Sequence, residues 1–206
     1  MAHNEFNPNP RHPLLIVISG PSGVGKDSVL AELKARRLDF HYIVTVTTRP
    51  PRANEVEGVD YFFVSDAQFA DMIEKDELIE YALVYNDYKG IPKEQVRQAF
   101  HSGKDVVMRV DVQGAQTIRR LAPDALLIFL TVEHEQEMVD RLSARSTESP
   151  ANLKLRIATC RMELKRIEQF DYIVPNRANC LSETVDTILA IIHAEHHKVK
   201  PRKVEL

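Results

Sequence analysis

A run of seven residues with the spacing G-x-x-x-x-G-K could bind a chain of phosphates. It begins at Gly20, ends at Lys26, and contains Pro21, Ser22, Gly23, Val24 and Gly25. Glycines let backbone N–H groups turn inward around phosphate oxygens, and a helix starting here adds its N-terminal partial positive charge. The lysine can reach the β- and γ-phosphates. The spacing therefore predicts a nucleoside triphosphate site.

The residue after this lysine departs from the motif. A Ser or Thr hydroxyl normally stands there and contacts Mg²⁺, whereas this chain has Asp27, with Ser28 one position later. Three arrangements stay open: Asp27 contacts the metal directly, it does so through water, or the metal is held elsewhere.

Two arginines at short spacing could bind a second phosphate group. Arg49 and Arg52 lie three residues apart in a polar segment stiffened by Pro50 and Pro51. A guanidinium group offers a planar fork of donors that matches a phosphate dianion, and the hydroxyl of Tyr61 could add another donor. Arginines in a polar loop are commonly plain solvated charge, so the spacing alone does not decide between the two interpretations.

These residues need elements that position them. Residues 14–19 are an unbroken apolar run, typical of a strand buried on both faces, and helical spacing follows at Val29, Leu30 and Leu33. Further strands are predicted at 42–46, 61–64, 78–85, 105–112, 125–132 and 171–176. Helices are predicted at 65–75, where Ser65 and Gln68 fit a capping box, between Pro92 and Gly103, and at 134–145, 150–168 and 182–197. Buried strands alternating with helices predict an α/β fold with a parallel sheet.

Composition narrows the class of protein. The chain has 206 residues with a formal net charge of −3, which gives no electrostatic case for binding nucleic acid. No apolar run approaches the ~20 residues that span a bilayer, and no secretory signal opens the chain. The two cysteines, Cys160 and Cys180, make neither a disulfide framework nor a metal-ligand spacing. We therefore expect a cytoplasmic protein without nucleic-acid or membrane partners.

Several motifs, in order and at matching spacing, resemble the guanylate kinase family. They are GPSGVGK (20–26), TTRPPR (47–52), EVEGVDYFFV (55–64), ELIEYALVYNDYKG (77–90), VDVQGA (110–115) and an arginine-rich stretch at 141–156. The resemblance covers about 14–198 and implies a P-loop core (14–44, 92–138 and 158–198). It also implies an inserted GMP-binding lobe (45–91) and a helical lid (139–157). Residues 1–13 are then expected to be a flexible leader, and 199–206 a solvated basic tail.

The same resemblance implies roles for individual residues. Lys26, Arg49, Arg145 and Arg156 would be catalytic, and Arg141 would be either a further lid arginine or a solvated residue of a helix face. ATP would be held by residues 20–28, including Asp27 and Ser28, and by Asn176 at its adenine. GMP would be held by Thr45, Arg49, Arg52, Tyr61, Glu80, Tyr88, Lys89 and Asp111, with Glu80 reading the guanine. Mg²⁺ would accompany ATP, with Asp27 and Asp111 as candidate ligands.

Three further positions differ from the family pattern. Lys89 stands where a second tyrosine is common, Ile91 replaces a Ser or Thr that helps to read guanine, and Arg109 replaces the first carboxylate of D-x-D. In P-loop folds the loop and this neighbouring strand end close together. We therefore predict an ion pair between Asp27 and Arg109, with the charged groups within about 6 Å, because an uncompensated Asp would repel ATP.

The expected activity is transfer of the γ-phosphate of ATP to GMP, and to dGMP, by a monomer or a homodimer. Two alternatives stay open. One is a noncatalytic interaction module of the same fold, against which the complete phosphate loop argues. The other is a nucleoside monophosphate kinase with a different base preference, suggested by Ile91.

Overall fold

A computed structural model describes residues 12–36, 39–53, 55–84, 86–144 and 150–204. Its centre is a parallel five-stranded sheet in the order β2-β7-β1-β8-β9. The strands are β2 (Phe40–Tyr42), β7 (Asp105–Arg109), β1 (Leu15–Ser19), β8 (Leu126–Thr131) and β9 (Tyr172–Pro175). The predicted parallel α/β fold is thus confirmed.

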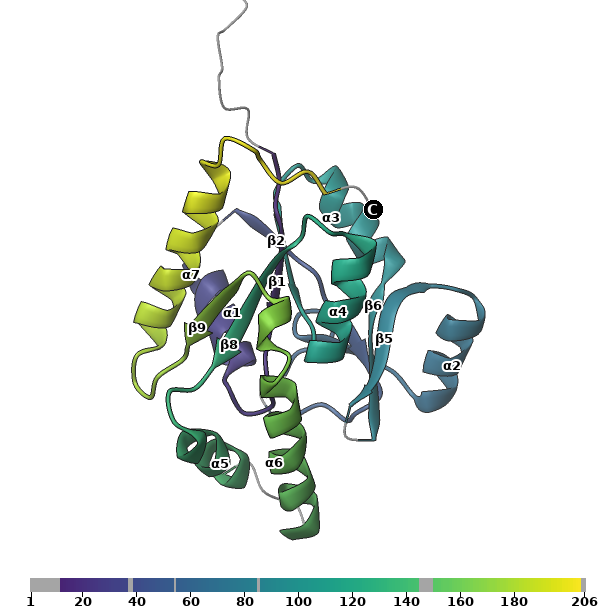
Figure 1. Ribbon diagram of the computed structural model, residues 1–206. Coiled ribbons are helices and arrows are strands. Elements are labelled where there is room, and N and C mark those ends of the chain that lie inside the picture. Colours follow the sequence, from purple (N-terminus) through teal and green to yellow (C-terminus); the bar gives the residue numbers. More distant parts are fainter. Residues whose placement is uncertain (1–11, 37–38, 54, 85, 145–149, 205–206) are drawn as a thin grey trace, which may run out of the picture.

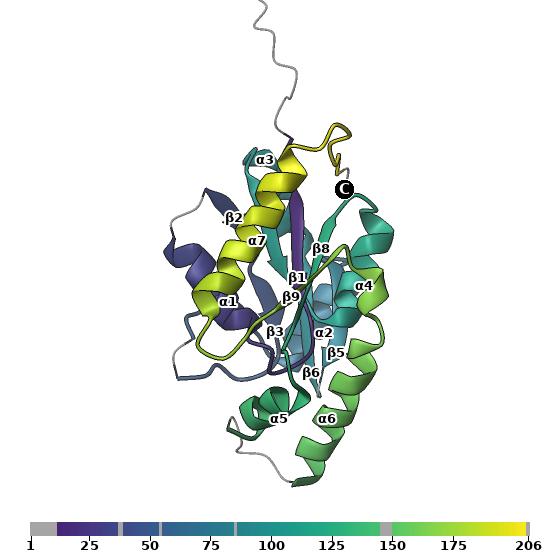
Figure 2. The ribbon, with the colours of Figure 1, turned by 60° about the vertical axis from the view of Figure 1, so that its left-hand side comes forward.

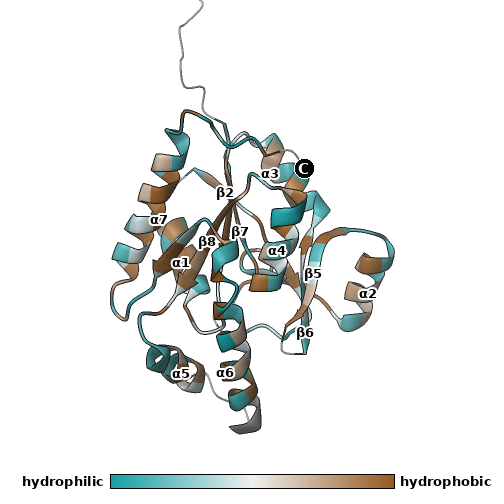
Figure 3. Cartoon of the chain, viewed as in Figure 1, coloured by the Kyte–Doolittle hydropathy of each residue, from teal (hydrophilic) through white to brown (hydrophobic). Residues whose placement is uncertain are grey.

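Alternation along the central strands sends side chains to two opposite cores. Ile16 and Ile18 face the core built with α1 (Lys26–Ala35) and α7 (Leu181–His196). Leu15 and Val17 face the core built with α3 (Lys93–His101) and α4 (Val112–Leu121). The sheet is therefore covered by helices on both faces, as Figures 1 and 2 show, and its strands are the most apolar part of the ribbon in Figure 3. The carboxyl ends of β1 and β7 meet at one edge, which places the phosphate loop beside Arg109.

A second sheet of four strands lies beside the first, in the order β4-β3-β6-β5. Its strands are β4 (Tyr61–Phe63), β3 (Thr45–Thr47), β6 (Asp87–Pro92) and β5 (Leu78–Val84). One face packs on α2 (Asp66–Glu74) through Phe69, Val46 and Leu78. Helix α2 begins with the predicted capping box between Ser65 and Gln68.

Two helices lie near the carboxyl ends of the parallel strands, at the bottom of Figure 1. They are α5 (Glu135–Ala144) and α6 (Pro150–Leu164), and a short 3₁₀ turn, η1 (Ile167–Gln169), follows. They pack together through Met138, Leu142 and Cys160. None of the described helices is long and apolar enough to cross a membrane.

The structure differs from the sequence predictions in several details. The single strand at 42–46 is two strands, β2 and β3, in different sheets, because the chain leaves the central sheet between them. The strand predicted to end at 112 ends at Arg109, where Asp111 caps α4 with an oxygen that accepts from the Gly114 N–H. Helix α4 and strand β6 were not predicted.

The C-terminal tail is a further correction. Arg202 is only 12% exposed; its Nε donates to Glu195 at 2.6 Å, and its Nη1 donates to the carbonyl of Ala125 at 3.1 Å. Val204 packs against the core beneath α3 and α4. Arg202 and Val204 are therefore docked rather than solvated, because the cation of Arg202 meets a buried carboxylate on α7, whereas Val199 is exposed.

Candidate active site

The phosphate loop runs from the end of β1 to the start of α1 and is folded as the motif requires. Gly20, Gly23 and Gly25 have φ angles of +140°, +83° and +91°, which other residues rarely adopt. The Lys26 ammonium bends back over the loop and donates to the carbonyls of Gly20 at 2.5 Å and Pro21 at 2.9 Å. Burial lowers the pKa of Lys26. The loop thus holds a desolvated cation over its own backbone.

Side chains from α5 and the end of β9 support this loop from behind. The Asn176 amide is 5% exposed and donates to the carbonyl of Val24 at 2.7 Å. Arg141 donates to the same carbonyl at 3.3 Å and to the carbonyl of Asn176 at 2.8 Å. Neither side chain lines the cleft that lies between the phosphate loop and the second sheet. The geometry therefore shows Asn176 as a brace for the loop.

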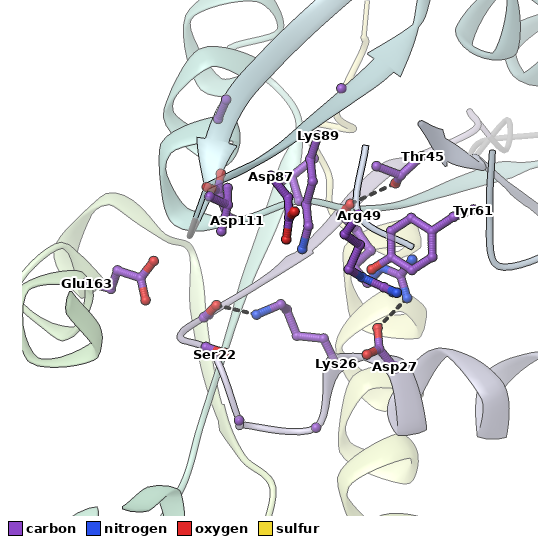
Figure 4. Close-up of a pocket in the computed structure, with 18 of the residues that line it drawn as sticks. Ser22, Lys26, Asp27, Thr45, Arg49, Tyr61, Asp87, Lys89, Asp111 and Glu163 are labelled. Carbon is purple, nitrogen blue, oxygen red and sulfur yellow. Dashed lines mark hydrogen bonds and ion pairs between the residues drawn. The ribbon is translucent and has the colours of Figure 1, made fainter. Parts of the chain in front are cut away.

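A cleft lies between the phosphate loop and the second sheet (Figure 4). Most of the predicted side chains line it together, from elements far apart in the chain; they are Ser22, Lys26, Asp27, Thr45, Arg49, Arg52, Tyr61, Glu80, Lys89, Asp111 and Arg156. Lys26 and Lys89 point into the same space from opposite walls. Burial and the neighbouring Lys26 and Arg109 lower the pKa of Lys89 to about 8.

Arg49 is oriented by one carboxylate and two aromatic rings. It is 8% exposed, and its two terminal nitrogens donate to Glu55 at 2.7 and 2.5 Å in a bidentate pair. Its guanidinium carbon lies 4.8 Å from the centre of the Tyr61 ring and 5.7 Å from that of Phe63. The guanidinium is consequently held rigidly at the cleft wall, as a phosphate-binding arginine must be.

The predicted ion pair between Asp27 and Arg109 is confirmed. A terminal nitrogen of Arg109 contacts Asp27 Oδ1 directly, and Arg52 reaches the other oxygen of Asp27 at 3.8 Å. The Arg109 guanidinium also lies 4.2 Å from the centre of the Tyr61 ring and donates to the carbonyl of Asp60 at 3.0 Å.

Three carboxylates face the cleft opposite these cations. Burial, with Asp111 as a second cause, raises the pKa of Glu80 to about 8. Asp111 caps α4 with Oδ1, while its buried Oδ2 has no hydrogen-bond partner in the described structure. Burial raises the pKa of Glu163 to about 7, although Lys26 lowers it. Unpaired buried carboxylate oxygens in a cleft are ready acceptors for a ligand.

Some predicted residues lie elsewhere. Tyr88 stacks on Phe69 beneath α2 at 5.2 Å, because alternation along β6 sends Lys89 to the cleft and Tyr88 to the opposite face. The side chains of Pro21, Val24 and Ser28 are absent from the walls, although the loop itself forms one of them. Ile91 is fully buried in the core built with α3 and α4. The predicted Arg145 lies outside the described residues.

Sequence reasoning missed Glu163. Figure 4 shows its carboxylate pointing from α6 towards Asp111 and Lys26. The backbone N–H of Ser22 donates to it, so α6 contacts the phosphate loop. Glu163 lies seven residues after Arg156, which puts both side chains on one face of the helix, and this spacing is the sequence signal that could have identified Glu163.

Comparisons with known proteins agree on one family. The family profile described as guanylate kinase matches residues 12–195. Guanylate kinase 2, chloroplastic/mitochondrial, of Oryza sativa subsp. japonica is 48% identical over 198 residues, covering 96% of this chain and 70% of that protein. The guanylate kinase of Thermobifida fusca strain YX is 42% identical, covering 87% and 91%. A solved guanylate kinase from Anaplasma phagocytophilum superposes with a TM-score of 0.74 at 26% identity, covering 92% and 89%.

Proposed function

The chain belongs to the guanylate kinase family, and we propose that the cleft between its two sheets transfers the γ-phosphate of ATP to GMP, giving ADP and GDP. The observation that carries this assignment is the meeting of three groups in one cleft. Lys26 comes from the phosphate loop, Arg49 from the segment after β3 together with Tyr61 of β4, and Glu80 from strand β5. They correspond to a donor phosphate site, an acceptor phosphate site and a base-reading group.

The donor phosphates bind in the phosphate loop. Its backbone N–H groups and the first turn of α1 face the β-phosphate, and Lys26 exchanges its two backbone carbonyls for phosphate oxygens. Arg141 and Asn176 keep the loop in its binding conformation. Asn176 lies at the position of the family's adenine contact, so the adenine is expected beside it.

The acceptor phosphate binds opposite, between Arg49, Arg52, Tyr61 and Lys89. Arg49 offers a fork of donors already aligned by Glu55, and Lys89 adds a buried cation where the family commonly has a tyrosine. Thr45 lies at the base of this wall, with its hydroxyl bonded to the carbonyl of Arg109 at 3.3 Å.

Guanine is read by Glu80, with Asp111 beside it. Guanine presents N1–H and N2–H₂ donors on one edge, and a carboxylate can accept from both, whereas adenine does not offer that pair. Ile91, the register partner of Glu80 on the neighbouring strand, contributes apolar packing in place of the hydroxyl common in the family.

Transfer needs positioning and electrostatic stabilisation rather than a base, because the attacking group is already a phosphate oxygen. Charge that develops on the transferred group meets Lys26 and, from the lid side, Arg156; Arg145 is proposed from the sequence as a second lid arginine. Residues 45–91 as a GMP lobe and 139–157 as a lid are part of the same proposal.

Magnesium fits this cleft as a partner of ATP. The described residues contain no group of three or more His, Cys, Asp or Glu able to hold a metal alone, and Mg²⁺ commonly uses one or two carboxylates with substrate phosphates and waters. The free oxygen of Asp111 suits that role. The charge of Asp27 is compensated by its ion pair with Arg109, so any contact between Asp27 and Mg²⁺ would pass through water. Bound Mg²⁺ would neutralise charge on the β- and γ-phosphates.

A coupled ADP-release assay with GMP, dGMP, AMP, UMP and CMP tests the proposal. We expect turnover with GMP and dGMP only. K26A and R49A should each lower kcat/KM by well over 100-fold with little loss of folding, because each removes a charged phosphate contact. A folded wild-type chain that turns over none of the five acceptors would be a noncatalytic module. Preference for AMP would refute the role of Glu80. Action in the cytoplasm, as a monomer or homodimer, remains part of the proposal.

A further inference from the structure

Asp27 places a negative charge in a site built for polyphosphate. It occupies the first turn of α1, directly after the lysine of the phosphate loop. An acidic residue suits the N-terminus of an isolated helix, but here the same partial positive charge must serve ATP. Asp27 is 41% exposed at its side chain and lines the cleft. It would therefore repel the donor phosphates unless another group cancels its charge.

Arg109 is placed to do this by the central sheet. It is the last residue of β7 and lies opposite Ile18 of β1, two residues before Gly20. Its side chain is 10% exposed, so it has little freedom to turn away from Asp27. The pairing of two parallel strands thus fixes the cation beside the loop.

The same guanidinium also reaches the acceptor side. One of its terminal nitrogens contacts Asp27, the other donates to the carbonyl of Asp60 at 3.0 Å, and its central carbon lies 4.2 Å from the centre of the Tyr61 ring. Asp60 and Tyr61 lead into β4, on the wall assigned to the GMP phosphate. Arg109 therefore joins three segments: the donor loop, the central sheet and the acceptor wall.

We propose that Arg109 is a positioning residue that makes the acidic phosphate loop competent for ATP by cancelling Asp27, while holding Tyr61 for the acceptor phosphate. This inference rests on the proposed function of the cleft. It assigns Asp27 a structural charge pair in place of the direct metal contact made by a hydroxyl in the common motif. Arg109 and Asp27 then act as one neutral unit, so losing Arg109 alone leaves an uncompensated carboxylate beside the phosphates, whereas losing both partners does not.

A double-mutant cycle tests the unit by calorimetric binding of a non-hydrolysable ATP analogue, with and without Mg²⁺. R109M leaves Asp27 uncompensated and should weaken binding at least tenfold without Mg²⁺. D27N should change binding less than threefold, and D27N/R109M should return to within about threefold of wild type. R109K keeps the charge and should retain more affinity than R109M, which keeps the test available if R109M does not fold. A matched control is the ion pair Arg36–Asp186, where α1 ends, whose removal should leave ATP affinity unchanged.

The outcomes separate the two proposals. An equal loss from R109M in the wild-type and D27N backgrounds would overturn the charge-cancelling role, since Arg109 would then act on nucleotide independently of Asp27. A D27N enzyme that binds the analogue normally without Mg²⁺ but needs much more Mg²⁺ for tight binding would make Asp27 a metal ligand and also overturn it. Wild type that fails to bind the analogue at all would instead refute the proposed function.

The acceptor side has its own readout. Calorimetry with GMP alone, without ATP or metal, should show weaker binding for R109M in both backgrounds, because Tyr61 loses the group stacked on it. Unchanged GMP affinity in R109M would refute the link from Arg109 to the acceptor wall.

Discussion

Replacing Gly114 by alanine should damage guanine recognition while leaving the fold intact. Gly114 is the third residue of α4, and its N–H donates to Asp111 Oδ1 at 2.7 Å. A Cβ atom at this position would lie 2.8 Å from Glu80 Oε1, 2.9 Å from Glu80 Cδ and 3.0 Å from Val110 Cβ. Only the far end of the Glu80 side chain can yield easily, so the carboxylate must move.

The expected magnitudes follow from these contacts. Alanine within a helix gains about 1 kcal/mol over glycine, which offsets the cost of the close contact, so the free energy of unfolding should change by less than about 1 kcal/mol. A displaced Glu80 loses at least one hydrogen bond between a charged group and guanine, worth about 1.5–3 kcal/mol. The KM for GMP should therefore rise about 10- to 150-fold, while the KM for ATP stays unchanged.

Steady-state kinetics with GMP and IMP provide the assay. IMP lacks the 2-amino group, so a misplaced Glu80 should also reduce the preference for GMP over IMP. Gly103→Ala is the control: nothing lies within 4 Å of its added Cβ, but its φ of +65° makes alanine strained. It should cost about 1 kcal/mol of stability without changing either KM. A G114A enzyme with unchanged KM for GMP and unchanged base preference would show that Glu80 does not read guanine.

Three further predictions concern buried charges. Burial raises the pKa of Glu80 to about 8, and guanine binds its carboxylate form, so GMP binding near pH 7 should release about one proton and should tighten as pH rises from 6.5 to 8. Calorimetry in two buffers of different ionisation enthalpy should detect the released proton, and the E80Q variant should not release it. Burial raises the pKa of Glu163 to about 7 in the folded protein, against about 4.5 in the unfolded chain. As pH rises from about 4.5 to 7 the unfolded chain loses this proton first, so the free energy of unfolding should fall by up to about 1.4 kcal/mol per pH unit. Urea titrations should show a shallower decline for E163Q, and an unchanged slope would mean that this carboxyl titrates normally. R202M should destabilise the protein by about 3 kcal/mol, because it leaves the Glu195 carboxylate, 1% exposed, without its closest cation. The double variant R202M/E195Q should recover part of this loss. An R202M protein as stable as wild type would show that Arg202 is solvated, as expected from the sequence.

Much of the fold and of the site could be predicted from residues that are close together in the sequence. The apolar run before Gly20, the capping box at Ser65 and the helical spacing after Lys26 each concern neighbours in the chain, and the structure has each as predicted. The Asp27–Arg109 pair was also predictable, although 82 residues separate its partners. Parallel strands end at a common edge, so two complementary departures at strand ends are brought together by topology alone.

The rest depended on the assembled structure. Tyr88 and Lys89 are adjacent in sequence, and only the pairing of β6 decides which one faces the cleft. Residues 42–46 read as one strand because local patterns do not record where the chain leaves one sheet for another. The sequence around Arg202 indicates a solvated charge, because only the packing of α7 in the folded chain places the buried Glu195 beside it.

The sequence by itself therefore determined the phosphate loop, the alternation of buried strands with helices and the family of phosphotransferases to which the chain belongs. Their signals lie in short-range spacing and composition. Only the tertiary structure decided which face of β6 enters the cleft, that Glu163 on α6 contacts the phosphate loop, and that one arginine serves both walls. These depend on contacts between distant segments, whose burial and charge no local pattern encodes.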